Sequence, residues 1–480
     1  MTPLRRSHPA IVPAVLLVLL AGAPGVVANP PHRARIAAHV PAAARDRNPA
    51  AMAAGDLRFP ITRERLANGL EILVVEDHTV PVVTLFTFFR TGSRHERTGR
   101  TGISHLFEHL MFNGAKKYGP GAFDRALESR GGTSNAFTSE DVTGYYEVFP
   151  PAALPTVVDL EVDRLTGLTL TEASLKSERE VVKEERRERV EEDPMGALDE
   201  LLQATAYLAH PYHWPVVGWP ADLDAITVDD CREYFRVHYA PNNAVLVLSG
   251  DVEPRAALEA LRKGYGAIPS QEPAPAVVAD EPEQKGERRA FLRRPAQLPA
   301  LAIAFHVPGT KDGGATLFAL DLVQTILGGG ESSRLQQALV RDRPLATSVQ
   351  AENLDRIDPS LFVVRAEARP GATLDALERG IVAELERLGR EPVSDRELQK
   401  AKNQARMDLL RQLKTSAGKA ELLGSAAVFF GAPEKLFERP QALEQVTAEQ
   451  VRAAAARFFR ADNRTVVQLV PAEPEEKAGP

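Results

Sequence analysis

The chain has 480 residues, of which 44% are hydrophobic and 26% charged, a balance that excludes a disordered chain and allows two or three domains. Its net charge of −7, with lysines and arginines scattered along the sequence, gives no reason to expect a nucleic acid as a partner. The single cysteine, Cys231, excludes an intrachain disulfide, and its place in a helical pattern indicates a buried, unreactive thiol.

The N-terminal segment is typical of a secretory signal peptide. Two arginines precede an apolar stretch at residues 11–21, and small residues follow up to Ala28. The apolar stretch is short for a membrane span, so we predict a cleaved signal at residues 1–28 and no stable membrane anchor. We therefore expect export across the inner membrane to the periplasm, with a flexible Ala/Pro/Arg-rich spacer at residues 29–54.

Strand and helix patterns follow the spacer and predict an α+β fold. Apolar and polar residues alternate around the Asn-Gly pair at residues 68–69, which is typical of a β-hairpin, and a third strand is expected at residues 82–89. Helical patterns continue to a Pro/Glu-rich stretch at residues 269–290, which we interpret as an interdomain linker. It separates a predicted N-terminal domain, residues 55–268, from a predicted C-terminal domain, residues 291–474.

The two predicted domains end in similar stretches. One stretch begins at Thr227 and the other at Thr447, 220 residues later. Each reads as a Thr-capped helix, an aromatic pair, an asparagine turn at Asn243 or Asn463, and a β-rich strand. We therefore predict a duplication, in which each domain packs helices against a largely antiparallel sheet.

Residues 101–114 contain the pattern of a metal-binding helix. Apolar residues at helical spacing predict that this helix packs into a core. His105 and His109 lie four residues apart and project from one face, a spacing that lets two imidazoles share a tetrahedral zinc ion. Glu108 lies beside them as a candidate general base, and the order His-x-x-Glu-His is the inverted zinc-peptidase motif. The pattern alone also fits histidines that are merely packed or exposed.

A third ligand is expected in a glutamate-rich helix further along the chain. Glu178 and Glu185 lie two helical turns apart, and Val181 and Val182 are predicted on the same side, so the acidic pair should share its face with buried residues. Carboxylates in such a position need a cation or another partner to compensate them. The spacing alone leaves Glu184 open as the ligand.

Together the motifs resemble those of the pitrilysin/insulinase family of zinc peptidases, especially its shorter two-domain branch with mitochondrial processing peptidase and bacterial relatives. The resemblance rests on GSRHERTGRTGISHLFEHLMFNGAKK from Gly92, GGTSNAFTSEDVTGYYEVFP from Gly131, EREVVKEE from Glu178, HPYHWPVVGW from His210 and YAPNNAVLVLSGD from Tyr239. It implies a zinc endopeptidase that hydrolyses unstructured peptides. It also implies a clam-shell chamber of four such domains, of which this chain supplies two.

The resemblance also implies roles for individual residues. Glu185, the last glutamate of its segment, would be the third ligand of one zinc ion per chain, beside the two histidines and with Glu108 as base. Glu178 would orient a ligand from outside the coordination sphere. Asn135 and Ala136 would form hydrogen bonds with an extended peptide substrate.

One departure from the family pattern concerns the second domain. Active members usually carry an arginine and a tyrosine seven residues apart, whereas LVRDRPLATSV from Leu339 places Val340 and Thr347 at those positions. We therefore expect this chain to be the zinc subunit of a heterodimer whose second subunit supplies the Arg/Tyr pair, with a homodimer as the alternative. A non-catalytic structural subunit and a metal-binding protein without peptidase activity remain alternatives for the function.

Overall fold

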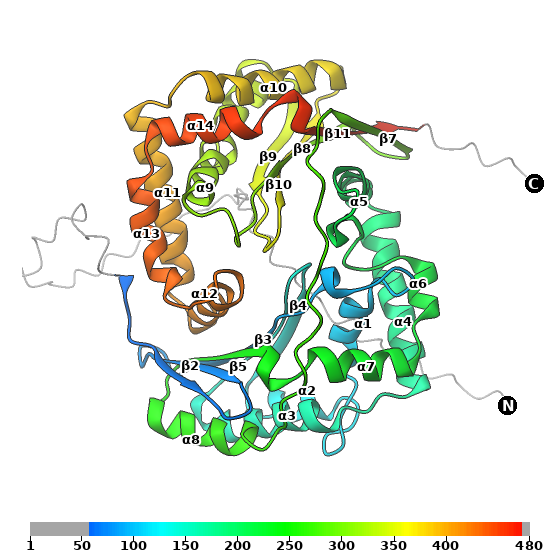
Figure 1. Ribbon diagram of the computed structural model, residues 1–480, viewed down its shortest axis with the longest axis vertical. Helices are drawn as coiled ribbons and strands as arrows, with labels where there is room; N and C mark the ends of the chain where they lie inside the picture. The colour runs from blue at the N-terminus through cyan, green and yellow to red at the C-terminus, as the bar shows by residue number, and fades with distance from the viewer. Residues whose placement is uncertain (1–56, 473–480) are drawn as a thin grey trace, which may run out of the picture. The chain divides into compact units, whose positions relative to one another are not determined.

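The computed structural model describes residues 57–472 and contains two β-sheets accompanied by helices (Figure 1). This is the α+β fold that the sequence predicts. The predicted signal peptide and spacer lie outside the described residues. From Phe59 onward, the described residues belong to one compact unit. Among them, no helix combines the length and the apolar composition that crossing a membrane requires.

The N-terminal sheet has six strands in the order β1-β2-β6-β3-β5-β4. The predicted hairpin is formed by β1 and β2, which are antiparallel and turn at Gly69, whose φ of 88° suits glycine. All neighbouring strands are antiparallel except β2 and β6, and β4 forms one edge of the sheet. The strands are β1 (Thr62–Arg65), β2 (Glu71–Glu76), β3 (Val83–Phe89), β4 (Thr133–Thr138), β5 (Thr143–Phe149) and β6 (Ala244–Gly250).

The helices of the N-terminal half, except α5, pack against this sheet and form a core with it. Leu106 and Phe107 of α1 are fully buried in that core, and the Phe107 ring lies 4.7 Å from the ring of Tyr239. Helix α1 also contacts α4 and the edge strand β4. The helices are α1 (Ile103–Leu110), α2 (Ala122–Glu128), α3 (Leu154–Gly167), α4 (Glu172–Arg186), α5 (Pro194–Ala206), α6 (Pro220–Ala225), α7 (Val228–His238) and α8 (Pro254–Tyr265).

The C-terminal sheet has five strands in the order β7-β11-β8-β10-β9, and all neighbours are antiparallel except β7 and β11. Its strands are β7 (Arg288–Arg294), β8 (Ala300–Val307), β9 (Ala346–Asn353), β10 (Ser360–Ala368) and β11 (Arg464–Pro471). The accompanying helices are α9 (Ala315–Gly328), α10 (Leu374–Arg390), α11 (Asp395–Gln412), α12 (Ser416–Phe429), α13 (Lys435–Gln445) and α14 (Ala448–Phe458).

The predicted duplication is confirmed by the topology of the sheets. In each half, a parallel pair, β2 with β6 or β7 with β11, is followed by three antiparallel strands. The turn asparagines also correspond, because Asn243 Nδ2 donates to the His238 carbonyl at 2.8 Å and Asn463 Nδ2 donates to the Phe458 carbonyl at 2.9 Å. The two helices α7 and α14 both begin with a threonine capping box. The same sequence pattern thus forms the same local structure twice.

Each half also packs one helix against the sheet of the other half (Figure 1). Helix α12 lies on β3 and β6, and a Cβ atom at Gly424 would approach the Phe88 ring to 2.0 Å, so only glycine permits this contact. Helix α5 lies on the C-terminal sheet, where Leu198 and Leu202 share a buried cluster with Val467. The segment that follows the α4 glutamates is therefore anchored on the C-terminal sheet.

Candidate metal centre

Helix α1 carries both histidines, and its first turn is stabilised from outside the helix. The N-cap residue is Gly102, with a φ of 86° and no side chain to accept the first amide protons. Glu96 accepts them instead, from Gly102 N and Ser104 N, at 2.8 Å each. Gly218 of the HPYHWPVVGW motif packs against this turn, and a Cβ atom there would lie 2.4 Å from the Gly102 Cα. These contacts fix the start of α1.

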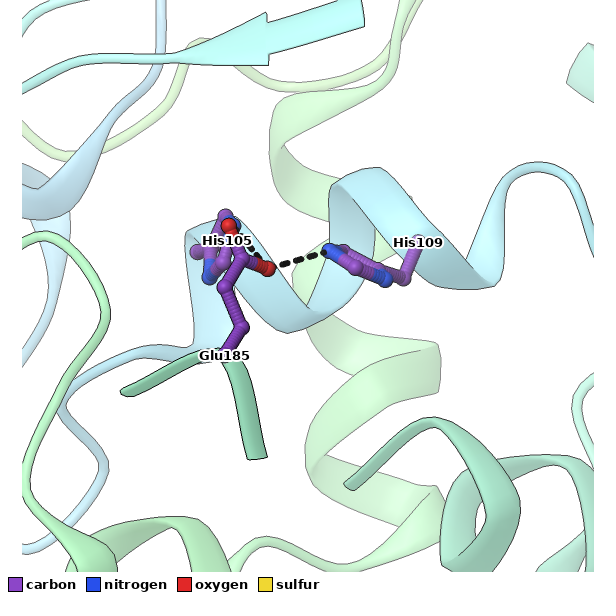
Figure 2. A group of neighbouring side chains, drawn as sticks. All are labelled: His105, His109 and Glu185. Atoms are coloured by element: carbon purple, nitrogen blue, oxygen red, sulfur yellow. Dashed lines mark ion pairs between the residues drawn. The ribbon is translucent and has the colours of Figure 1, made fainter. Parts of the chain in front are cut away.

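The structure brings His105, His109 and Glu185 together from α1 and α4 (Figure 2). Glu185 Oε2 lies 3.5 Å from His105 Nε2 and 3.4 Å from His109 Nε2. The two imidazole rings are nearly perpendicular, with centroids 4.9 Å apart. Tetrahedral ligands about 2.0–2.1 Å from a zinc ion lie roughly 3.4 Å from one another, so the carboxylate and both imidazoles fit a shared zinc ion.

The electrostatics of the three side chains also suit a cation. Burial lowers the pKa of His105 to about 4, which leaves the ring in the neutral form that binds metals. Burial acts in the same direction on His109, but the carboxylates of Glu178 and Glu185 outweigh it and raise the pKa to about 9. Burial opposes the charge of Glu185, yet the two histidines and Arg189 lower its pKa to about 2. The two carboxylates therefore favour a positive charge at His109, whether it is a proton or a metal ion.

Glu108 lies between the histidines in sequence and is half-buried. Thr138 Oγ1, from the edge strand β4, donates a hydrogen bond to Glu108 Oε2 at 2.6 Å. Burial raises the pKa of Glu108, and the Thr138 hydrogen bond offsets part of this effect. A carboxylate with a raised pKa is a better proton acceptor near neutral pH. The contribution of Thr138 was missed in the sequence, because it arises from a contact between segments thirty residues apart.

The other two glutamates of α4 differ in position. Glu178 Oε2 lies 3.5 Å from His109 Nδ1, on the side of the ring opposite the Nε2 atom that faces Glu185. Glu184 is 48% exposed and pairs with Arg187. The alternative that the spacing left open, Glu184 as the ligand, therefore has no support in this arrangement.

The prediction for the valines of α4 is correct for one residue and wrong for the other. Val182 is fully buried, whereas Val181 is 47% exposed. At about 100° per residue, Glu178, Val182 and Glu185 form one narrow stripe along the helix, and Val181 lies at the edge of that stripe. The acidic pair nevertheless shares its stripe with a buried residue.

The candidate substrate strand is β4, which pairs only with β5 among the described strands. Asn135 Oδ1 accepts a hydrogen bond from Ala136 N at 2.8 Å. Ala136 is buried and Asn135 half-buried. Because Thr138 of the same strand contacts Glu108, the strand passes beside the candidate metal centre.

The two positions at which the family pattern has arginine and tyrosine lie in the C-terminal half. Val340 packs against the C-terminal core, and Thr347 is exposed on the edge strand β9. The nearby Arg341 is paired with Glu331 at 2.7 Å. Neither position offers a cation or a phenol, as the sequence indicates.

Two further side chains, of residue types that often react or bind metals, do not belong to the candidate site. Cys231 is buried in α7, as predicted, and burial raises the pKa of its thiol to about 12, so it is unreactive. His210 is fully buried in a loop, with its Nε2 atom 3.3 Å from Asp358. Among the described residues, the one group of three or more side chains with the geometry of a metal site is therefore His105, His109 and Glu185.

Comparison with known proteins places the chain in a family. The model of Insulinase (Peptidase family M16) matches residues 71–218, and that of the Peptidase M16 inactive domain matches residues 225–405. Zinc protease PqqE of Helicobacter pylori is 32% identical over 410 residues, which cover 85% of this chain and 92% of the relative.

Solved structures show the same fold. The crystal structure of a protease from Helicobacter pylori has a TM-score of 0.83 at 31% identity, over 86% of this chain and 99% of that chain. The periplasmic protease PqqL from Escherichia coli has a TM-score of 0.71 at 18% identity, over 85% of this chain but 47% of that chain.

The chain combines a duplicated α+β fold with a His-x-x-Glu-His helix that lies beside a helix carrying a glutamate. This combination defines a class of metallopeptidase-like proteins. The chain belongs to the insulinase family, peptidase family M16, which confirms the resemblance found in the sequence.

Proposed function

We propose that the chain is a zinc endopeptidase that hydrolyses unstructured peptides. The observation that carries this proposal is the convergence of His105, His109 and Glu185 on one point, with Glu185 Oε2 3.4–3.5 Å from both Nε2 atoms. These three residues would hold one zinc ion. When bound, zinc activates a water molecule and polarises the carbonyl group of the scissile bond.

Glu108 is the proposed general base. Its carboxylate would accept a proton from the attacking water and later deliver it to the amine nitrogen of the leaving group, so the group is regenerated in each turnover. Thr138 would hold the carboxylate in position through its 2.6 Å hydrogen bond, and Glu178 would orient the His109 ring from its Nδ1 side. General acid–base catalysis of this kind contributes about 10²- to 10⁴-fold.

The edge strand β4 is the proposed binding site for the substrate backbone. An extended peptide can add to the free edge of a sheet through main-chain hydrogen bonds, and Asn135 and Ala136 would supply such bonds. Because only an extended segment can pair in this way, the substrates would be unstructured peptides.

We also propose a second subunit of the same family as partner. Val340 and Thr347 stand where the family pattern has the arginine and the tyrosine, and they provide neither a cation nor a phenol. A partner chain would therefore supply the Arg/Tyr pair and complete a four-domain chamber. The match to about half of the longer PqqL chain supports an assembly of two such chains. The proposed location is the periplasm. A mass measurement on material from the native host tests the assembly, and a fully active homodimer would contradict the heterodimer.

A non-catalytic structural subunit is the second candidate, and the residues at 340 and 347 favour it. Peptide hydrolysis separates the two. We expect the zinc-loaded protein, assembled with its partner, to cleave a long fluorogenic peptide in a chelator-sensitive manner. Glu108→Gln should retain zinc and lose at least about 10²-fold in turnover. Equal rates for this variant and the wild type would refute the peptidase mechanism.

A further inference from the structure

The Glu185 carboxylate has two different neighbours on its two oxygen atoms. Oε2 faces both imidazoles, whereas Oε1 lies 2.6 Å from the Arg189 Nη1 atom. The Glu185 side chain is 14% exposed and that of Arg189 is 43% exposed, so the carboxylate is largely enclosed by protein while the guanidinium reaches it from the solvent side. Most exposed pairs four residues apart on a helix contribute little to stability. This pair differs because one partner is a candidate metal ligand.

The backbone that carries Arg189 is not an ordinary α-helix. Residues Arg187–Glu191 form a π-helical turn directly after α4, in which Glu192 N donates to the Arg187 carbonyl at 2.7 Å. Such turns often occur at functional sites, because the extra residue changes the direction of the side chains. The neighbouring arginines are directed elsewhere: Arg186 pairs with Glu200, and Arg187 pairs with Glu184.

Contacts with both halves of the molecule hold the π-helical turn in place. Arg294 of β7 donates to the Val190 carbonyl at 2.9 Å. On the other side, α5 approaches so closely that a Cβ atom at Gly196 would lie 1.8 Å from the Arg189 carbonyl oxygen. Because α5 packs on the C-terminal sheet, that half supports the backbone from which Arg189 reaches Glu185.

We propose that Arg189 is a positioning residue, which holds Oε1 of Glu185 so that Oε2 is presented to the metal. This inference rests on the proposed role of Glu185 as a zinc ligand. A planar guanidinium is suited to this task, because it binds a carboxylate in a fixed orientation and is always charged. Removal of a residue that supports a ligand typically weakens metal binding about 10- to 100-fold.

The test is the zinc affinity of the full chain, measured by competition with a chromophoric chelator. We expect Arg189→Gln to bind zinc about 10- to 100-fold more weakly than the wild type. Arg189→Lys keeps the charge but loses the planar guanidinium, so its zinc affinity should lie between those of Arg189→Gln and the wild type. The absorption spectrum of the cobalt-substituted protein should change in the same variants, since it reports the geometry of the ligands.

Arg187→Ala is the matched control, because it removes a similar ion pair two residues away without touching Glu185. It should bind zinc as the wild type does. If Arg189→Gln binds zinc as tightly as the wild type, the inference is wrong, and any loss of peptide hydrolysis in that variant would indicate a substrate contact instead. A wild-type chain that binds no zinc would refute the proposed function itself.

Discussion

At the scale of single residues, protons and a metal ion compete for the same atoms of the candidate site. His109 has a pKa raised to about 9, since Glu178 and Glu185 outweigh the effect of burial, and His105 is neutral down to about pH 4. Between these values the metal-free site holds one proton on His109, which zinc must displace.

The apparent zinc affinity should therefore fall about tenfold for each unit that the pH decreases from about 8 to about 6. Chelator competition at several pH values measures this slope. Glu178→Gln removes one of the carboxylates that raise the pKa of His109, so its slope should be shallower near neutral pH. A zinc affinity that does not change with pH would contradict the assignment of His109.

The hydroxyl of Thr138 is expected to matter for turnover and not for the metal. Thr138→Val removes the hydrogen bond to Glu108 and keeps the shape of the side chain, so kcat should fall roughly 10- to 100-fold, as the loss of a hydrogen bond to a charged group implies. Thr138→Ser retains the hydroxyl and should stay near the wild-type rate. A loss of zinc in Thr138→Val would show that the residue acts on the ligands instead.

At the scale of the elements, α1 depends on a cap that lies outside the helix. Glu96→Ala leaves the amides of Gly102 and Ser104 without an acceptor and should lower the free energy of unfolding by about 1–2 kcal/mol. Because α1 carries both histidines, zinc affinity should fall as well. Denaturant unfolding and chelator competition measure the two effects.

Glu253→Ala offers a control for this variant. Glu253, the N-cap residue of α8, also accepts from two amides, Arg255 N and Ala256 N, but α8 carries no residue of the candidate site. Glu253→Ala should lower the free energy of unfolding and leave the zinc affinity unchanged. An equal effect of the two variants on zinc binding would contradict a specific role of Glu96 in placing α1.

The elements that the sequence predicted are those with strong local signals. The Asn-Gly hairpin, the His-x-x-Glu-His helix and the repeated helix-turn-strand are each determined by residues close together in the chain. Thr138, Arg189 and Glu96 could not be found in this way, because their roles depend on contacts between elements or on a π-helical turn. The exposure of Val181 was missed for a related reason. Helical spacing shows which residues share one side of a helix, but it does not show how much of that side the neighbouring elements bury.

At the scale of the whole molecule, the exchange of α5 and α12 links the stability of the two halves. Leu202 of α5 is fully buried against the C-terminal sheet, so Leu202→Ala should lower the free energy of unfolding by about 2–5 kcal/mol. Leu208→Ala is a matched control, since Leu208 is 65% exposed and its loss should change stability by less than about 0.5 kcal/mol. Denaturant unfolding measures both. Similar losses of unfolding free energy in Leu202→Ala and Leu208→Ala would contradict the packing of α5 on the C-terminal sheet.

We propose that His105, His109 and Glu185 hold one zinc ion in each chain. Anomalous scattering at the zinc absorption edge, from crystals of the zinc-loaded protein, locates the ion. We expect one strong peak per chain, about 2.0–2.1 Å from a nitrogen of each histidine and at a similar distance from a Glu185 oxygen. A zinc ion bound elsewhere, or no peak beside these residues in zinc-loaded crystals, would contradict it.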